Sequence, residues 1–205
     1  MMHYLYKIIN KINFEVYNLF SSIYVFVSIR ALKIKIKKGR KINGFPRFII
    51  KKNSKIDIGE NFAVNSGYLY NPIGRNQRCI FSVAENAKLK IGDNVGLSSV
   101  AIICQTSIII GNNVKIGGNT LIYDTDFHSL DFKERVAFPE ITSNIKRKKV
   151  VIGDNVFIGG HSIILKGVEI GSNSIVGAGS VVSKNIPPNQ IWAGNPARFI
   201  KEIIE

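Results

Sequence analysis

The hydrophobic positions between residues 152 and 187 recur every six residues, a period that fits neither an α-helix nor an ordinary amphipathic strand. Six consecutive blocks open on an aliphatic residue, and glycine follows that residue in four of them. The opening residues are Ile152, Ile158, Ile164, Ile170, Val176 and Val182. A six-residue repeat is typical of a parallel β-helix, and three blocks of this length make a coil of about eighteen residues.

Each block predicts one short strand followed by one corner. The opening aliphatic side chain points to the axis, whereas Gly, Asn and Asp suit the corners because they tolerate positive φ. One coil cannot bury its own interior, so several coils must stack through backbone hydrogen bonds. A β-sandwich, with turn signals every eight to twelve residues or so, does not fit so short a spacing.

The same spacing extends less regularly toward the N-terminus. It begins near Ile56, is interrupted at residues 67–81, resumes from Ile91 to Ile122, and breaks again before Val150. Loops that leave a solenoid commonly carry function. We therefore expect an N-terminal segment of residues 1–55, a β-helix of residues 56–190 with an inserted loop at 123–149, and a tail of residues 191–205 containing a short helix.

Residues 1–32 predict an amphipathic helix, because apolar side chains fall close to i, i+3, i+4 spacing and neither Gly nor Pro interrupts them. The uncharged run from Val16 to Ile29 has fourteen residues. A bilayer span needs roughly 20 residues. Lys7 and Lys11 precede this run as in a signal peptide, but no convincing small-residue cleavage site follows. An interfacial or packing helix is expected.

Charge is concentrated just after this helix. The 205 residues carry a net charge of +14, and eleven Lys or Arg with no acidic residue lie between Arg30 and Lys55. Their alternation with apolar side chains predicts strands with a basic face, which serves either as a solvated edge or as a docking surface for an anionic membrane. Nucleic acid is not an expected partner, because no recognisable nucleic-acid-binding motif accompanies the basic residues. Hydrophobic residues at 45% and charged residues at 20% indicate a globular chain.

The two cysteines, Cys79 and Cys104, have no CxxC spacing and no His-rich neighbour. Neither a disulfide framework nor a zinc site is indicated, and a reducing cytosol is the default compartment. Both thiols are expected to be small core or corner residues.

The run IGDNVFIGGHSIILKGVEIGSNSIVGAGSVVSKNIPPNQIWAGNPARFIKEI, which begins at Ile152, resembles the left-handed β-helix acyltransferases of the maltose, galactoside and polysaccharide O-acetyltransferase group. The resemblance is specific over residues 90–205, moderate over 56–89 and absent over 1–55. It implies a left-handed coil, a homotrimer, and an acyl-CoA site between neighbouring coils. It also implies a catalytic histidine near an extended loop.

The matching histidine is His128, in DTDFHSLDFKER, where the chain leaves its repeat. Transfer of an acyl group from a thioester to a sugar hydroxyl needs a base, and neutral imidazole has a suitable pKa for that role. A lone histidine in a loop is otherwise more often a surface residue. Asp124, Asp126 and Asp131 are candidates to orient the ring or to bind acceptor hydroxyls, with the choice left open.

The resemblance also assigns binding residues. Small side chains let a pantetheine arm lie along the coils, although the same residues suit coil packing, and basic side chains suit the phosphates of coenzyme A. A backbone N–H is expected to stabilise the oxyanion. Acceptor contacts fall on Ser99 and Asn119, and acyl-CoA contacts on Gly160, Ala178, Ser183, Lys184, Arg198 and Lys201.

Two departures from the family pattern bear on the acceptor. Phe157 replaces the tryptophan found in many members, and residues 1–55 do not match the helical domain of the maltose and galactoside enzymes. The second departure favours a lipid-linked or nucleotide-linked saccharide over a small free sugar. We therefore expect an acetyl-CoA-dependent O-acetyltransferase of surface polysaccharide biosynthesis (O-antigen, capsule or exopolysaccharide), located in the cytoplasm or peripherally on the inner face of the membrane.

Other functions stay open at this point. An N-acetyltransferase acting on an amino- or nucleotide-sugar uses the same fold, and a non-catalytic scaffold that docks on a membrane or polyanion needs only the N-terminal segment. A zinc carbonic anhydrase of the γ type requires three histidine ligands. The chain has only His3, His128 and His161, so no metal is expected. Acceptor identity and the size of the acyl group are not predicted.

Overall fold

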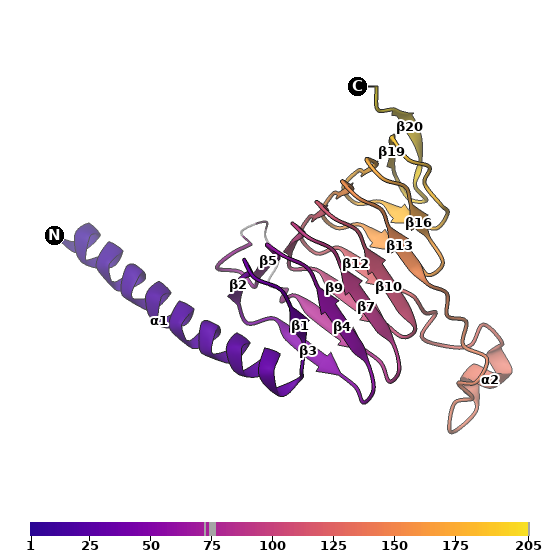
Figure 1. Cartoon of the computed structure of the whole chain (residues 1–205), viewed down its shortest axis with the longest axis horizontal. Helices are drawn as coiled ribbons and strands as arrows, with labels where there is room; N and C mark the ends of the chain where they lie inside the picture. Colours follow the sequence, from indigo (N-terminus) through magenta and orange to yellow (C-terminus); the bar gives the residue numbers. More distant parts are fainter. Residues whose placement is uncertain (72, 74–76, 205) are drawn as a thin grey trace.

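The computed structural model describes residues 1–71, 73 and 77–204. Three sheets, parallel except for the terminal pair β19–β20, wind through it as the faces of one β-helix (Figure 1). Sheet A contains β1 (Lys35–Ile36), β4 (Lys55–Ile58), β7 (Lys88–Ile91), β10 (Ser107–Ile110), β13 (Val150–Ile152) and β16 (Glu169–Ile170). Sheet B contains β2 (Lys41–Gly44), β5 (Ala63–Ser66), β8 (Gly96–Ser98), β11 (Lys115–Ile116), β14 (Phe157–Ile158), β17 (Ile175–Val176), β19 (Gln190–Ala193) and β20 (Arg198–Glu202). Sheet C contains β3 (Arg47–Ile50), β6 (Ile80–Val83), β9 (Ala101–Cys104), β12 (Leu121–Tyr123), β15 (Ile163–Ile164) and β18 (Val181–Val182).

The aliphatic positions of the repeat form the core. Every predicted opening residue from 152 to 182 is buried, and each pairs with its equivalent in the next coil. In sheet A one continuous column runs through Ile58, Ile91, Ile110, Ile152 and Ile170. The spacing therefore predicted both the strands and the residues that face the axis, and this part of the prediction is confirmed.

Corners of the β-helix use residues that tolerate positive φ. Asn94, Asn113 and Asn155 lie one above another at the corner between sheets A and B, with φ of 58°, 59° and 59°. The side-chain amide of each donates to the side-chain oxygen of the next, at 3.0 and 2.9 Å. This asparagine column satisfies polar groups at a corner where a side chain with Cβ branching would be strained.

The first coil begins earlier than predicted. Strands β1 to β3 lie within residues 35–50 and pair in register with the second coil, so the boundary drawn at residue 56 falls inside the β-helix. Ile36, Ile42 and Phe48 pack against the core from this coil while its Lys and Arg side chains point outward. The basic strip is therefore part of the β-helix.

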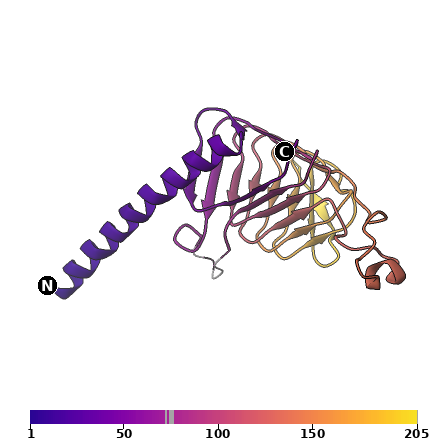
Figure 2. The same ribbon diagram turned by 90° about the horizontal axis from the view of Figure 1, so that it is seen from below.

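Helix α1 (Met2–Ala31) confirms the predicted N-terminal helix and projects from the first coil (Figures 1 and 2). Only its C-terminal half lies against the strands, where Ile29 and, just after the helix, Leu32 pack on the core. Within the described residues it is the one helix long and apolar enough to cross a membrane by length and composition, which near an N-terminus is weak evidence of a span.

The chain ends in an antiparallel strand pair, and the predicted short C-terminal helix is wrong. Strand β20 pairs with β19, and the Trp192 and Phe199 rings meet edge to face at 6.5 Å. This hairpin covers the last coil, as solenoid ends require. Residues 72 and 74–76 of the predicted interruption lie outside the described residues.

Candidate active site

Two edges of sheet C carry the predicted site residues other than Lys201. We call the corners that join sheet B to sheet C the B–C edge, which includes residues 99–100, 117–120, 159–162 and 177–180. The corners that join sheet C to the next sheet A strand form the C–A edge, which includes residues 105–106, 124–149, 165–168 and 183–185. Strand β12 separates these edges by about 10 Å.

The inserted loop of residues 123–149 leaves the C–A edge through a narrow neck. Thr125 pairs antiparallel with Arg147, and the Asp126 and Lys148 amides donate across the neck at 3.0 and 2.9 Å. Beyond the neck the loop folds into the short helix α2 (Phe132–Val136) and projects from the β-helix. This isolated bridge and the two backbone hydrogen bonds hold the base of the loop in a defined position.

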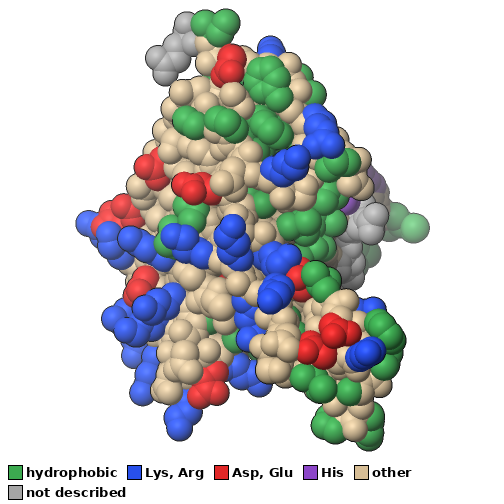
Figure 3. Space-filling view, turned by 90° about the vertical axis from the view of Figure 1, so that its right-hand side faces the viewer, with side chains coloured by type: hydrophobic (Ala, Val, Ile, Leu, Met, Phe, Trp, Pro, Cys, Tyr) green, Lys and Arg blue, Asp and Glu red, His purple; other side chains and the backbone are tan. Residues whose placement is uncertain are grey.

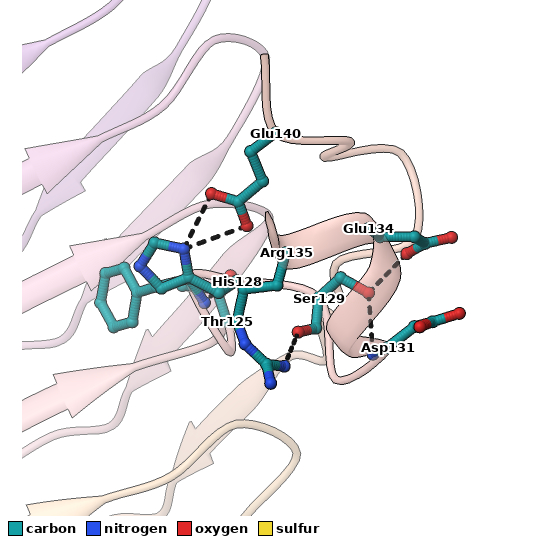
Figure 4. Close-up of polar contacts among 8 residues, drawn as sticks. Thr125, His128, Ser129, Asp131, Glu134, Arg135 and Glu140 are labelled. Atoms are coloured by element: carbon teal, nitrogen blue, oxygen red, sulfur yellow. Dashed lines mark hydrogen bonds and ion pairs between the residues drawn. The ribbon is translucent and has the colours of Figure 1, made fainter. Parts of the chain in front are cut away.

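A carboxylate network stabilises the loop itself. Glu134 accepts hydrogen bonds from the Ser129 hydroxyl and the Asn144 amide, and these two bonds lower the pKa of its carboxyl. Arg135 donates to the Ser129 carbonyl at 2.7 Å. These contacts fold residues 129–144 into a compact unit (Figure 4).

His128 lies on this loop and is held by a residue that the sequence did not indicate. Its Nδ1 lies 3.1 and 3.0 Å from the two carboxylate oxygens of Glu140, and Figure 4 shows the other ring nitrogen directed away from Glu140. The His128 side chain is 64% exposed and that of Glu140 26%. When Nδ1–H donates to the carboxylate, Nε2 carries the lone pair and is available as a base.

The three aspartates that were candidates to orient His128 have other partners. Asp124 is fully buried and accepts hydrogen bonds from the amides of Gln105, Thr106 and Ser107 at 2.6–2.7 Å. Since its carboxylate closes the turn between β9 and β10, the assignment of Asp124 to the acceptor is corrected to a structural role.

Asp126 and Asp131 are also turned away from the ring. Asp126 pairs with Lys166 at 2.7 Å, although its Oδ2 is buried with no hydrogen-bond partner among the described residues. Asp131 caps α2 by accepting from the Lys133 amide at 2.8 Å, and Figure 4 shows its carboxylate away from the His128 ring. Neither aspartate orients His128, which is the role that Glu140 takes instead.

Ser99 and Asn119 lie together on the B–C edge. The Asn119 amide donates to the Ser99 carbonyl at 3.1 Å, and both residues are at least nine-tenths buried. The Ser99 hydroxyl, the Asn119 side-chain amide and the Asn71 side-chain nitrogen have no hydrogen-bond partner within the described residues. Buried polar groups are usually satisfied, so this cluster is chemically suited to a polar ligand.

The predicted donor residues divide between the edges. Gly160 and Ala178 stack on the B–C edge, and Arg198 pairs with Ala193 at the end of the same edge. A Cβ at Gly160 would lie 2.9 Å from the Gly118 carbonyl oxygen, so close coil packing itself requires glycine there.

The remaining donor residues are exposed. Ser183 and Lys184 lie on the C–A edge, and Lys201 pairs with Ile191 in the terminal hairpin. A single chain therefore separates His128 and Lys184 from Asn119, Gly160 and Ala178, which occupy the opposite edge of sheet C.

The two thiols lie in the core, and His161 lies on the B–C edge beside Gly160. Cys79 and Cys104 are buried and unbridged, and burial raises the pKa of each thiol to about 12. His161 is at the B–C edge, with its amide bonded to the Gly118 carbonyl at 2.8 Å. Across the described residues, no three His, Cys, Asp or Glu side chains converge as metal ligands.

Comparison with known proteins identifies the family of this chain. A family model described as bacterial transferase hexapeptide (six repeats) matches residues 149–184, and one described as hexapeptide repeat of succinyl-transferase matches residues 88–124. An Escherichia coli K12 protein, provisionally named lipopolysaccharide biosynthesis O-acetyl transferase WbbJ, is 30% identical over 161 residues, covering 77% of this chain and 76% of that protein. The chain belongs to the hexapeptide-repeat acyltransferase family. The predicted resemblance and the left-handed parallel β-helix are thereby confirmed.

Other members of the hexapeptide-repeat acyltransferase family match over shorter stretches. The galactoside O-acetyltransferase of E. coli K12 is 39% identical over 128 residues, which is 60% of this chain and 57% of that protein. This chain spans only 44–63% of the length of four relatives that are 35–47% identical to it. A solved galactoside acetyltransferase in complex with coenzyme A has a TM-score of 0.53 at 26% identity, covering 83% of this chain and 65% of that one.

Proposed function

We propose that this protein transfers an acetyl group from acetyl-CoA to a hydroxyl of a saccharide used in surface polysaccharide biosynthesis, with His128 as the general base. The observation that carries the proposal is the His128–Glu140 pair, on an exposed loop inserted where the repeat breaks. The names of its relatives support this chemistry, because they include galactoside and lipopolysaccharide O-acetyltransferases.

The reaction follows from the ring geometry. Nε2 of His128 accepts the proton of the acceptor hydroxyl as its oxygen attacks the thioester carbonyl carbon. The resulting oxyanion requires a backbone N–H donor. When the tetrahedral intermediate collapses, the carbon–sulfur bond breaks and the departing thiolate takes the proton from the imidazolium, which leaves an acetyl ester and free coenzyme A.

Glu140 is a positioning residue in this scheme. Its carboxylate accepts the Nδ1 proton, so it selects the tautomer with a free Nε2 and stabilises the imidazolium formed during transfer. Both effects act only when the ring has the orientation seen in Figure 4.

The complete site requires a second copy of the chain. His128 and the polar cluster of Ser99 and Asn119 occupy opposite edges of sheet C, and a homotrimer brings the C–A edge of one subunit against the B–C edge of the next. The loop that carries His128 also exposes large apolar side chains, which gather at the lower right of Figure 3 and suit a subunit contact: Leu130, Phe132, Val136, Phe138 and Ile141.

Acetyl-CoA binds at the same contact between the C–A edge of one subunit and the B–C edge of the next. Gly160 and Ala178 provide a smooth coil surface for the pantetheine arm, while Lys184, Arg198 and Lys201 supply positive charge for the phosphates. All three basic side chains are exposed. Since acetyl-CoA is the donor, we place the reaction in the cytoplasm.

The test uses the full chain with acetyl-CoA and a panel of lipid-linked and nucleotide-linked saccharides. Mass spectrometry should show addition of one acetyl group, and hydroxylamine should remove it because esters are labile and amides are not. A stable product would instead establish N-acetylation. A wild-type protein without affinity for acetyl-CoA would refute the transferase proposal and leave the non-catalytic scaffold.

A further inference from the structure

Helix α1 packs on the β-helix through a face that combines tyrosines and Ser21 with the aliphatic residues Val25 and Ile29. The Tyr17 and Tyr24 rings contact Phe45 at 5.0 and 5.5 Å, and the Tyr24 hydroxyl donates to the Pro46 carbonyl at 2.9 Å. Ser21, on the same face, is buried. An amphipathic surface helix normally turns its apolar stripe inward, whereas most of the large apolar side chains of α1 are exposed.

The apolar stripe of α1 faces outward instead. Its residues are separated by alternating steps of four and three, which places them on one side of the helix. Each exposes between 47% and 61% of its surface. We call this set the outer stripe: Leu5, Ile9, Ile12, Val16, Leu19, Ile23 and Phe26.

The residues beside the outer stripe favour lipid over a second helix. In a coiled coil the flanking positions usually carry charged side chains that select the partner. Here Ile8, Phe20 and Val27 widen the apolar surface, and Glu15 is the single acidic residue on the helix. A broad apolar face with few charges fits the interior of a lipid leaflet.

The coil next to α1 is strongly basic. Residues 1–55 contain thirteen Lys or Arg and one acidic residue, so they hold twelve of the fourteen net positive charges of the chain. All eleven basic residues from Arg30 to Lys55 are exposed, and within the described part of the chain Lys37 alone among them lies within 4.0 Å of a carboxylate. Figures 1 and 2 show α1 leaving this coil.

We propose that α1 lies in the plane of an anionic bilayer, with the outer stripe among the acyl chains and the basic first coil at the lipid phosphates. The uncharged run of residues 16–29 is about 21 Å long as a helix. This length is less than the hydrocarbon thickness of about 30 Å, so an in-plane position fits better than a span.

If the protein transfers acetyl groups as proposed above, docking of α1 on a bilayer also identifies the class of acceptor. α1 contacts Phe45 and Tyr70, which belong to the B–C edge of the first two coils, and Ser99 and Asn119 lie further along that edge. Coils stack about 4.8 Å apart, so Asn119 lies about 14 Å from the coil that contacts the membrane. The acceptor is therefore a saccharide attached to a lipid of the same bilayer.

The first test is vesicle binding by the full chain. Wild type should sediment with vesicles of phosphatidylcholine and phosphatidylglycerol, and Leu19→Ser/Ile23→Ser should lower the partition coefficient by about 100-fold. Ile200→Ser/Ile204→Ser, a matched pair of exposed residues at the other end, should leave binding unchanged. Arg40→Gln/Lys41→Gln should lower it by about 25-fold on anionic vesicles.

The second test places the helix. The native thiols are buried, so a polarity-sensitive label on Leu19→Cys or Asn10→Cys reports one site. With vesicles, the Leu19 label should enter an apolar environment and the Asn10 label, on the opposite side of α1, should stay in water. Burial of both labels would establish a span, and burial of the Leu19 label without lipid would establish a second copy; either result overturns the proposal.

Two vesicle results also overturn the docking proposal: wild type that does not bind anionic vesicles, or the Leu19→Ser/Ile23→Ser variant binding them as well as wild type does. Acetyl transfer by that variant to a water-soluble acceptor separates the two proposals. Lost vesicle binding with retained transfer supports docking, whereas no transfer by wild type contradicts the proposed function alone.

Discussion

Replacing Glu140 tests whether the carboxylate that holds Nδ1 of His128 contributes to transfer. Glu140→Ala removes the acceptor of the 3.0 Å hydrogen bond, and Glu140→Gln keeps an acceptor oxygen but removes the charge. Neither change touches the aliphatic core, so the β-helix should fold normally. Any loss of rate then reports on ring position and imidazolium stabilisation.

The expected loss of kcat follows from the solvent exposure of His128 and Glu140. A hydrogen bond to a charged group contributes about 1.5–3 kcal/mol when water is excluded. His128 is 64% exposed and Glu140 26%, so solvent screening favours the lower end of that range. A loss of about 1.5 kcal/mol corresponds to a decrease of about tenfold in kcat for Glu140→Ala. A neutral hydrogen bond is about half as strong, so Glu140→Gln should lose about threefold.

The assay is acetyl transfer measured by release of free coenzyme A at saturating acetyl-CoA, with acetyl-CoA affinity measured separately. Glu85→Ala is a matched control, because Glu85 is an exposed carboxylate at an earlier corner of the C–A edge. A kcat for Glu140→Ala equal to that of wild type would refute the positioning role. A weaker acetyl-CoA affinity with unchanged kcat would assign Glu140 to donor binding instead.

Three further predictions concern folding. Asn113→Ala should lower the free energy of unfolding by about 1–2 kcal/mol, and Asn113→Gly should lower it by less, because φ at this position is 59° and glycine tolerates that value. Equal losses for the two variants in denaturant titrations would contradict the argument from backbone strain. Cys79 and Cys104 should not react with a thiol reagent at pH 8 until the chain unfolds. Their raised pKa also predicts stability that is lost as pH rises from the ordinary value of 9.0 toward about 12, and a flat profile there would contradict it. Glu134, whose pKa is lowered, should stabilise the inserted loop when the pH is above 4.5, the ordinary pKa of a glutamate, and should lose that effect as the pH falls further. Hydrogen exchange of residues 129–144 measures this, and protection that does not change with acid would disprove the role of the carboxylate network.

The six-residue spacing predicted most of the fold because it dictates which side chains face the axis. The same pattern was harder to follow at the first coil, where Ile36, Ile42 and Phe48 are interleaved with Lys and Arg and were interpreted as part of a separate basic strip. The C-terminal helix was wrong because β20 is stabilised by pairing with β19, a contact between segments that local sequence does not indicate.

The candidate site was partly predictable. His128 was identified by its family motif, whereas Glu140 lies twelve residues further along and reaches the ring only because α2 folds the loop back. Asp124 was misassigned because it is near His128 in sequence. The alternation that buries Ile122 also directs Asp124 inward, to the turn between β9 and β10.

The central claim is that His128 performs acetyl transfer at a site built on the β-helix. The most direct measurement compares wild type with His128→Ala for acetylation of a lipid-linked saccharide, with acetyl-CoA binding and oligomeric state recorded for both. We predict that the variant binds acetyl-CoA, keeps the same oligomeric state and transfers no acetyl group. Transfer by His128→Ala at the wild-type rate would contradict the account.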